Sequence, residues 1–304
     1  MKLDSALKTS LDELRMQMLG AQVLFGFQFQ GLFQDGFEGL PASGRAADAA
    51  ALGLMTIVLA LVLAVPSQHR IVEKGEDTLR TFRLSSRYAK CALAPLAAAI
   101  SCDLYVAMRL SYGARASMVG AGAAFFLGIG AWYILGLTSR KGHHRPMQES
   151  KARLHVKIEQ MLTEARVILP GAQALLGFQL IVMMTKMFGL LPPTVQRVHL
   201  IALFSLVLAI VLLITPAALH RLAFDGRDDP QMHRLGSLII TGALLPLAAA
   251  ITCDIAVALF KLYGGVVIPT VGALIAALLL LGLWYCVPLM RRRTLRQPTA
   301  ARQS

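Results

Sequence analysis

Two aspartates in apolar surroundings are the residues of this chain that could most readily do chemistry. Asp103 ends the segment APLAAAISCD and Asp254 ends LPLAAAITCD, and the two segments share eight of ten residues. Burying an ionised carboxylate in hydrocarbon costs at least about 2.5–3.5 kcal/mol and favours the protonated form unless the group has a partner. Such a carboxylate can bind and release a proton or a cation.

Glutamines are the expected partners of these aspartates. The apolar segment 19–34, LGAQVLFGFQFQGLFQ, is unusually rich in glutamine for a helix that faces lipid. Gln28 should lie about 13–14 Å deep and Asp103 about 18 Å deep, in an apolar core about 30 Å thick. We therefore expect an ion- or proton-binding site made of Asp103, Asp254, Gln28, Gln179, Gln22 and Gln173.

Two interpretations of this site stay open. The aspartates could exchange protons or cations during transport, or each could be a packing clamp that is hydrogen-bonded to a neighbouring helix for about 1 kcal/mol. Cys102 and Cys253 precede the aspartates, but adjacent helical residues point about 100° apart and cannot easily hold one ion. We expect no metal and no cofactor.

The composition places these residues in a membrane. The chain has 304 residues, of which 56% are hydrophobic and 15% charged, with a mean hydropathy of +0.61. Its net charge of +13 comes from basic residues between apolar segments, which argues against nucleic acid as a partner. The expected partners are the lipid bilayer and a proton or monovalent cation, and assembly into a homo-oligomer stays open.

The chain is internally duplicated. At an offset of 151 residues, Glu13 aligns with Glu164 and His69 with His220, and the two aspartates align with each other. The two domains predicted from this are a first repeat over residues 1–146, and a second repeat with a basic tail over residues 147–304.

Each repeat has four apolar segments preceded by an amphipathic stretch. Residues 3–18 carry one apolar stripe, which is typical of a helix at a membrane surface, and the pattern returns after residue 154. We predict an all-α fold of eight transmembrane helices, in two four-helix repeats of parallel orientation. The expected spans are 19–34, 49–65, 91–108, 118–137, 168–190, 199–215, 236–260 and 267–289.

The basic residues predict the orientation. All but six of the 30 Lys and Arg residues fall in segments on the side of the two termini, so the positive-inside rule makes both termini cytoplasmic. Charged residues at those helix ends could form an ion-paired collar, either structural or in contact with anionic lipid, or a gate. The collar residues are Glu13, Arg15, His69, Arg70, Arg83, Glu164, Arg166, His220, Arg221 and Arg234. The Trp and Tyr residues at the span ends, Trp284 among them, are expected in interfacial belts.

The chain resembles an uncharacterised family of small four-helix bacterial membrane proteins, mostly actinobacterial, some of which are labelled sodium:proton antiporters. The resemblance rests on Glu13, Arg15, Gln22, Phe27, His69, Arg70, Asp103, Trp132 and Tyr133, and on their counterparts in the second repeat. It implies a multi-pass protein of the bacterial inner membrane. The typical member is a single repeat, so the fusion of two repeats suggests that such relatives act as dimers.

No enzyme is expected. The chain has no Walker loop, no HExxH and no GxSxG, and one aspartate with a few glutamines per repeat is a poor basis for catalysis in a membrane. The leading prediction is a small proton- or cation-coupled transporter. The alternative is a non-transporting structural or accessory protein with clamped aspartates.

Overall fold

Most of the described residues are helical, and none of them is in a strand. The computed structural model describes residues 3–74, 76, 78–134, 154–224 and 228–296. The first half contains α1 (Leu3–Gly31), the short η1 (Asp35–Gly39), α2 (Ala42–Ile71), α3 (Leu79–Ser111), α4 (Ala114–Ile129) and the π-helical η2 (Gly130–Ile134). The second half contains α6 (Leu154–Met183), α7 (Lys186–Gly189), α8 (Pro193–Leu222), α9 (Pro230–Tyr263), α10 (Val267–Leu281), the π-helical η3 (Gly282–Cys286) and α11 (Val287–Arg296).

Seven helical segments of the described chain are long and apolar enough to cross a membrane. They comprise α2, α3, α4 with η2, α6, α8, α9, and α10 with η3 and α11. Several spans of this kind indicate a multi-pass membrane protein. α1, which contains the first expected span, does not reach that level of apolarity, because four glutamines and Arg15 fall in its most apolar stretch.

The prediction of a separate amphipathic helix before each repeat is wrong. Residues 3–18 continue without a break into the segment expected to be the first span, and residues after 154 do the same in the second repeat. α2 also continues beyond residue 65, where the second expected span ends, and runs through Pro66 to Ile71. Neighbouring helices can satisfy the backbone groups that an internal proline leaves free.

The third helix of each repeat begins earlier than its apolar run. α3 starts at Leu79, where the Thr78 hydroxyl accepts a hydrogen bond from the Thr81 backbone nitrogen at 3.2 Å. α9 starts at Pro230, after Asp229 accepts from the Gln231 nitrogen at 2.6 Å. These caps satisfy amide groups at the helix start and extend each helix through a charged segment.

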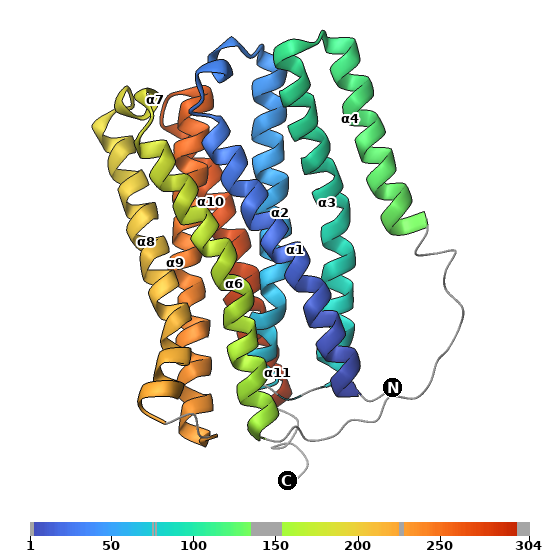
Figure 1. The fold of residues 1–304 in the computed structure, drawn as a ribbon, viewed down its shortest axis with the longest axis vertical. Coiled ribbons are helices and arrows are strands. Elements are labelled where there is room, and N and C mark those ends of the chain that lie inside the picture. The colour runs from blue at the N-terminus through green and yellow to red at the C-terminus, as the bar shows by residue number, and fades with distance from the viewer. Residues whose placement is uncertain (1–2, 75, 77, 135–153, 225–227, 297–304) are drawn as a thin grey trace.

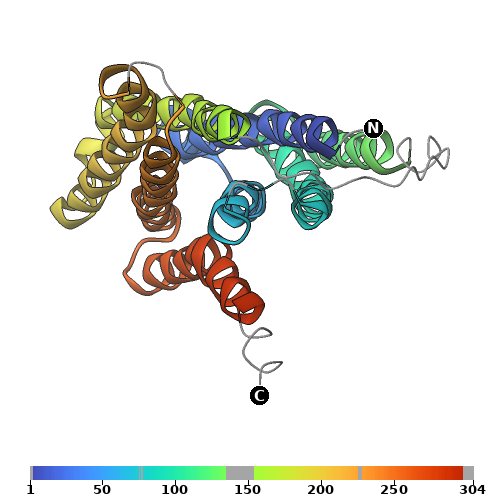
Figure 2. The ribbon, with the colours of Figure 1, turned by 90° about the horizontal axis from the view of Figure 1, so that it is seen from below.

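The two halves meet along their first helices. α1 and α6 lie side by side and run in the same direction, from the end that holds the termini to the opposite end (Figure 1). The view along the helices shows α2 beside both α3 and α9 (Figure 2). α10 packs mainly on α9 and lies on the opposite side of α2 and α9 from α1 and α6. The core therefore gathers side chains from both halves around α1, α2, α6 and α9.

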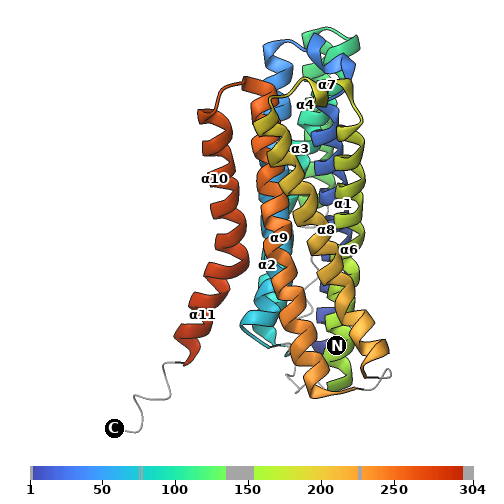
Figure 3. The ribbon, with the colours of Figure 1, turned by 90° about the vertical axis from the view of Figure 1, so that its left-hand side faces the viewer.

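The fourth helices of the two repeats are placed differently. α4 lies at one edge and packs mainly on α3, whereas η3 and α11 also pack on α2 of the first repeat (Figures 1 and 3). Trp284 is 0% exposed and donates its Nε1 hydrogen to the Ala60 carbonyl at 3.0 Å, while its counterpart Trp132 is 37% exposed. The expectation that Trp284 belongs to an interfacial belt is wrong, because it holds the two repeats together.

Candidate functional site

The first repeat brings Asp103 and Gln28 together. Gln28, in the last turn of α1, donates its Nε2 hydrogens to both carboxylate oxygens of Asp103 on α3, each at 3.0 Å. Asp103 lies about two turns, or about 12 Å, before the end of α3 that points away from the termini. Gln28 is buried, while Asp103 is partly exposed.

A second carboxylate, Asp48, reaches the same place from α2. Asp48 is 5% exposed, and its Oδ2 has no hydrogen-bond partner among the described residues. It lines a cavity of about 340 Å³ together with Gln28 and Asp103. The sequence did not predict Asp48 as a site residue, because residues 35–48 have the composition of a polar link, whereas α2 begins at Ala42. The available signal was the repeat alignment, which pairs Asp48 with His199 inside an apolar run.

The second repeat builds the equivalent cluster with different chemistry. Gln179 donates to Asp254 Oδ2 at 2.7 Å, as its counterpart does in the first repeat. His199, which takes the place of Asp48, donates its Nε2 hydrogen to the backbone carbonyl of Gln179 at 3.1 Å. Its Nδ1 lies 4.0 Å from Asp254 Oδ1, so a protonated histidine would form an ion pair with this aspartate. All three residues are buried.

Aromatic rings close this second cluster. Phe29 of α1 stacks on the His199 ring with centroids 5.6 Å apart, and Phe188 meets the same ring edge-on at 5.1 Å. The residue aligned with Phe29 is Leu180, which is 46% exposed and does not line the first-repeat cavity. The two clusters therefore differ: one is open and carries two carboxylates, and the other is sealed and contains a histidine.

The remaining predicted site glutamines lie elsewhere. Gln22 is buried at the crossing of α1 and α6, where its side chain lies against Gly171. Gln173 is exposed. Neither residue lines the cavity that holds Asp103, so the structure does not bring all six predicted site residues together.

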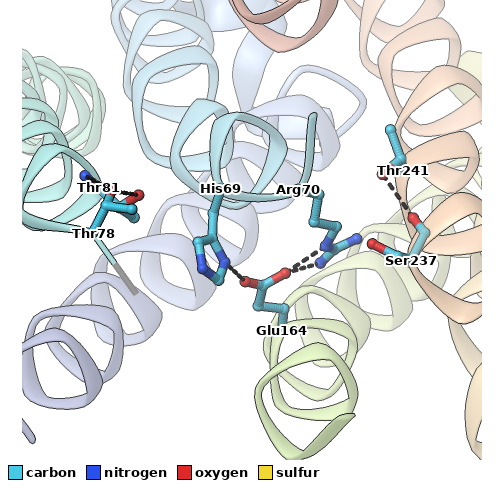
Figure 4. A network of polar contacts seen from close by, with 7 residues as sticks. All are labelled: His69, Arg70, Thr78, Thr81, Glu164, Ser237 and Thr241. Atoms are coloured by element: carbon cyan, nitrogen blue, oxygen red, sulfur yellow. Dashed lines mark hydrogen bonds and ion pairs between the residues drawn. The ribbon is translucent and has the colours of Figure 1, made fainter. Parts of the chain in front are cut away.

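Three of the predicted collar residues form a buried ion-pair cluster between the repeats. Glu164 of α6 accepts a hydrogen bond from His69 Nδ1 at 2.8 Å and is ion-paired with Arg70, both from α2 (Figure 4). Each of the three is at least nine-tenths buried. Burial of a charge on this scale requires a partner of opposite charge. This cluster joins the repeats at the end near the termini.

The rest of the predicted collar is dispersed. Glu13, Arg83, Arg166, Arg221 and Arg234 are exposed, and Arg15 and His220 are half-buried. In the described part of the chain no ion pair joins Glu13 to His220 or Arg221, although these are the counterparts of the buried cluster. The buried ion-pair cluster therefore forms once, between His69, Arg70 and Glu164, and not a second time between their counterparts.

Metal binding finds no support in the described ranges. No three His, Cys, Asp or Glu side chains of that part of the chain lie close enough together to hold a metal ion. The four cysteines are unpaired there, and Cys102 and Cys253 are partly buried beside their aspartates.

Comparison with known proteins gives a family without an activity. The model of a family described as "Family of unknown function (DUF6328)" matches residues 1–136 and, a second time, residues 148–288. Two matches in one chain are consistent with a tandem duplication. No curated protein and no solved structure matches the chain.

Proposed function

The chain belongs to DUF6328, a family of unknown function, and on the chemistry of its own site we propose that it is a small membrane transporter or ion-translocating protein, coupled to a proton or another cation. Asp103 is the exchanging carboxylate in this proposal. Asp48 stands beside it as a second acidic group, and Gln28 orients the Asp103 carboxylate.

The observation that carries the proposal is a pair of carboxylates on one cavity. Asp48 and Asp103 line the same space, and the buried Oδ2 of Asp48 has no partner among the described residues. Two carboxylates in an apolar environment cannot both stay ionised at low cost, so a proton or cation must neutralise them. Intramembrane acidic groups of this kind are typical of ion and proton pathways.

The proposed topology has eight spans in two parallel repeats, in a bacterial inner membrane. α1 would be the eighth span, because it packs along α6, its repeat counterpart, which is apolar enough to cross a membrane. Both termini are cytoplasmic in this proposal, since most Lys and Arg residues lie at that end of the helices. The protein acts as a transporter rather than an enzyme in this scheme.

A second candidate function is favoured by the second repeat. Asp254 is buried, hydrogen-bonded to Gln179 and covered by aromatic rings around His199. This is the geometry of a packing clamp, and a protein with two such clamps would be a structural or accessory membrane protein. The proposal therefore assigns exchange to Asp103 and a stabilising role to Asp254.

Proteoliposomes under an imposed pH or sodium gradient test the proposal. Wild-type protein and the Asp254→Asn variant should dissipate the gradient, and the Asp103→Asn variant should not. Wild type that dissipates it at the same rate as the Asp103→Asn, Asp254→Asn double variant would refute coupled transport.

A further inference from the structure

The cavity beside Asp103 has room for more than a bare ion. Its volume of about 340 Å³ corresponds to roughly eleven water molecules at about 30 Å³ each. Most of its wall is apolar, and Asp48 and Asp103 are its acidic groups. The apolar and aromatic wall residues are Leu24, Phe27, Phe37, Leu40, Val106 and Ala107. A small inorganic ion would leave this wall uncovered.

The protein supplies no cation to this space. None of the described residues that line it is Lys, Arg or His, whereas two of them, Asp48 and Asp103, are acidic. Gln28 Oε1 and Asp48 Oδ2 are buried acceptors without a hydrogen-bond partner in the described chain. Unpaired buried acceptors are costly, so a cationic ligand in the cavity would be strongly favoured.

The second repeat carries a basic side chain at the position of one carboxylate. His199 replaces Asp48, and Phe29 and Phe188 pack on its ring. In the second repeat, therefore, a basic residue replaces one of the two carboxylates, and Phe29 covers its ring. Phe188 is the counterpart of Phe37, which lines the first-repeat cavity. An aromatic face beside a positive charge is a favourable contact, worth about 0.5–2 kcal/mol depending on desolvation.

We propose that the cavity lined by Asp48, Asp103, Phe27 and Phe37 is a binding site for a monovalent organic cation with an apolar body. One carboxylate neutralises the cation, and a proton on the other keeps the cavity close to neutral. The apolar part of the ligand covers the wall, and Phe27 and Phe37 offer aromatic surface to the charge. This inference names the substrate class of the proposed transporter and rests on that proposal for its role in transport.

Calorimetric titration of the protein in lipid nanodiscs, with empty nanodiscs subtracted, tests the site without any gradient. The probe is benzyltrimethylammonium, and its uncharged carbon isostere, neopentylbenzene, is the control ligand. Wild type and Asp254→Asn should bind the cation alike, and Asp48→Asn and Asp103→Asn should bind it at least about tenfold more weakly. Neopentylbenzene should not distinguish these proteins.

A second variant keeps both carboxylates and changes only the space. Val106→Phe, in the cavity wall, should abolish binding of the cation while the protein still elutes as a folded species. Equal binding by wild type, Asp48→Asn and Asp103→Asn would overturn the site, as would full binding by Val106→Phe. Heat from sodium but none from benzyltrimethylammonium would overturn the organic class. Binding without gradient dissipation would instead refute the proposed function and leave the site intact.

Discussion

Single residues give the two repeats their different chemistry. The aspartate and glutamine of each cluster are identical in type and hydrogen-bond alike, but the third member is Asp48 in one repeat and His199 in the other. The first cluster faces a cavity, and the second is buried under Phe29. The first cluster therefore has two carboxylates, and the second has one carboxylate and one imidazole.

The pairing of Asp103 with Gln28 could be predicted from the sequence, because two depths along helices of known rise agree. The role of Asp48 could not, since a carboxylate six residues into a helix resembles one in a polar link. Likewise, nothing in the sequence shows that Glu164 is buried while Glu13 is exposed. That difference depends on which helices pack across the repeats.

Replacing Glu164 with glutamine should strongly destabilise the protein. The change removes the only acidic partner shown for Arg70 in the described structure and leaves a buried guanidinium without its counter-ion. Breaking a buried pair in this way costs about 3–5 kcal/mol. Thermal unfolding in detergent should show a large fall in the transition midpoint.

The matched control is Glu13→Gln at the equivalent position of the first repeat. Glu13 is exposed, and changes at exposed positions usually stay within about 0.5 kcal/mol. Similar midpoints for the two variants would contradict the account of the Glu164 cluster.

At the scale of elements, helix type could be predicted but helix limits could not. Apolar runs and small-residue faces indicate the helices, yet α1, α2 and α3 all extend beyond their apolar runs into charged or proline-containing segments. The π-helical turns that carry Trp132 and Trp284 leave no periodic signal in the sequence. In both repeats the following tyrosine donates its hydroxyl hydrogen to the third helix, at Lys90 and Thr241.

Close approach of α1 and α6 depends on Gly171. A Cβ atom there would lie 1.7 Å from Gln22 Oε1 and 2.8 Å from Gln22 Cβ, and the latter cannot swing away. Gly171→Ala should therefore lower the free energy of unfolding, by about 1–3 kcal/mol as is typical of overpacking. Chemical denaturation in mixed micelles would measure it.

The counterpart Gly20 provides the comparison. A Cβ atom at Gly20 meets nothing within 4 Å, so Gly20→Ala should be neutral or should stabilise its helix by up to about 1 kcal/mol. A loss of stability in Gly20→Ala as large as in Gly171→Ala would show that close helix approach is not the cause.

For the whole molecule, the tandem repeat predicts more symmetry than the structure has. The interface uses η3 and α11 of the second repeat against α2 of the first, and η2 makes no equivalent buried contact within the described ranges. Arg291 adds a 2.8 Å hydrogen bond to Gln68 across this interface. The two clusters share this asymmetry, because Phe29 covers His199 in the second cluster and its counterpart Leu180 does not line the first-repeat cavity.

The two tryptophans report this asymmetry directly, because the chain has only two. In bilayers that contain lipids brominated on their acyl chains, quenching should be strong in Trp284→Phe, which keeps the exposed Trp132. It should be weak in Trp132→Phe, which keeps the buried Trp284. Equal quenching in the two variants would contradict the one-sided interface.

The most direct test of the central claim is chemical access to the carboxylates of the two clusters. Native protein in nanodiscs would be treated with a water-soluble carbodiimide and methylamine, and the modified aspartates identified by peptide mass spectrometry. We predict modification of Asp103 and Asp48, and of Asp254 only after denaturation, because only the first cluster opens to a cavity. Modification of Asp254 at the same rate as Asp103 in the native protein, or protection of all three, would contradict it.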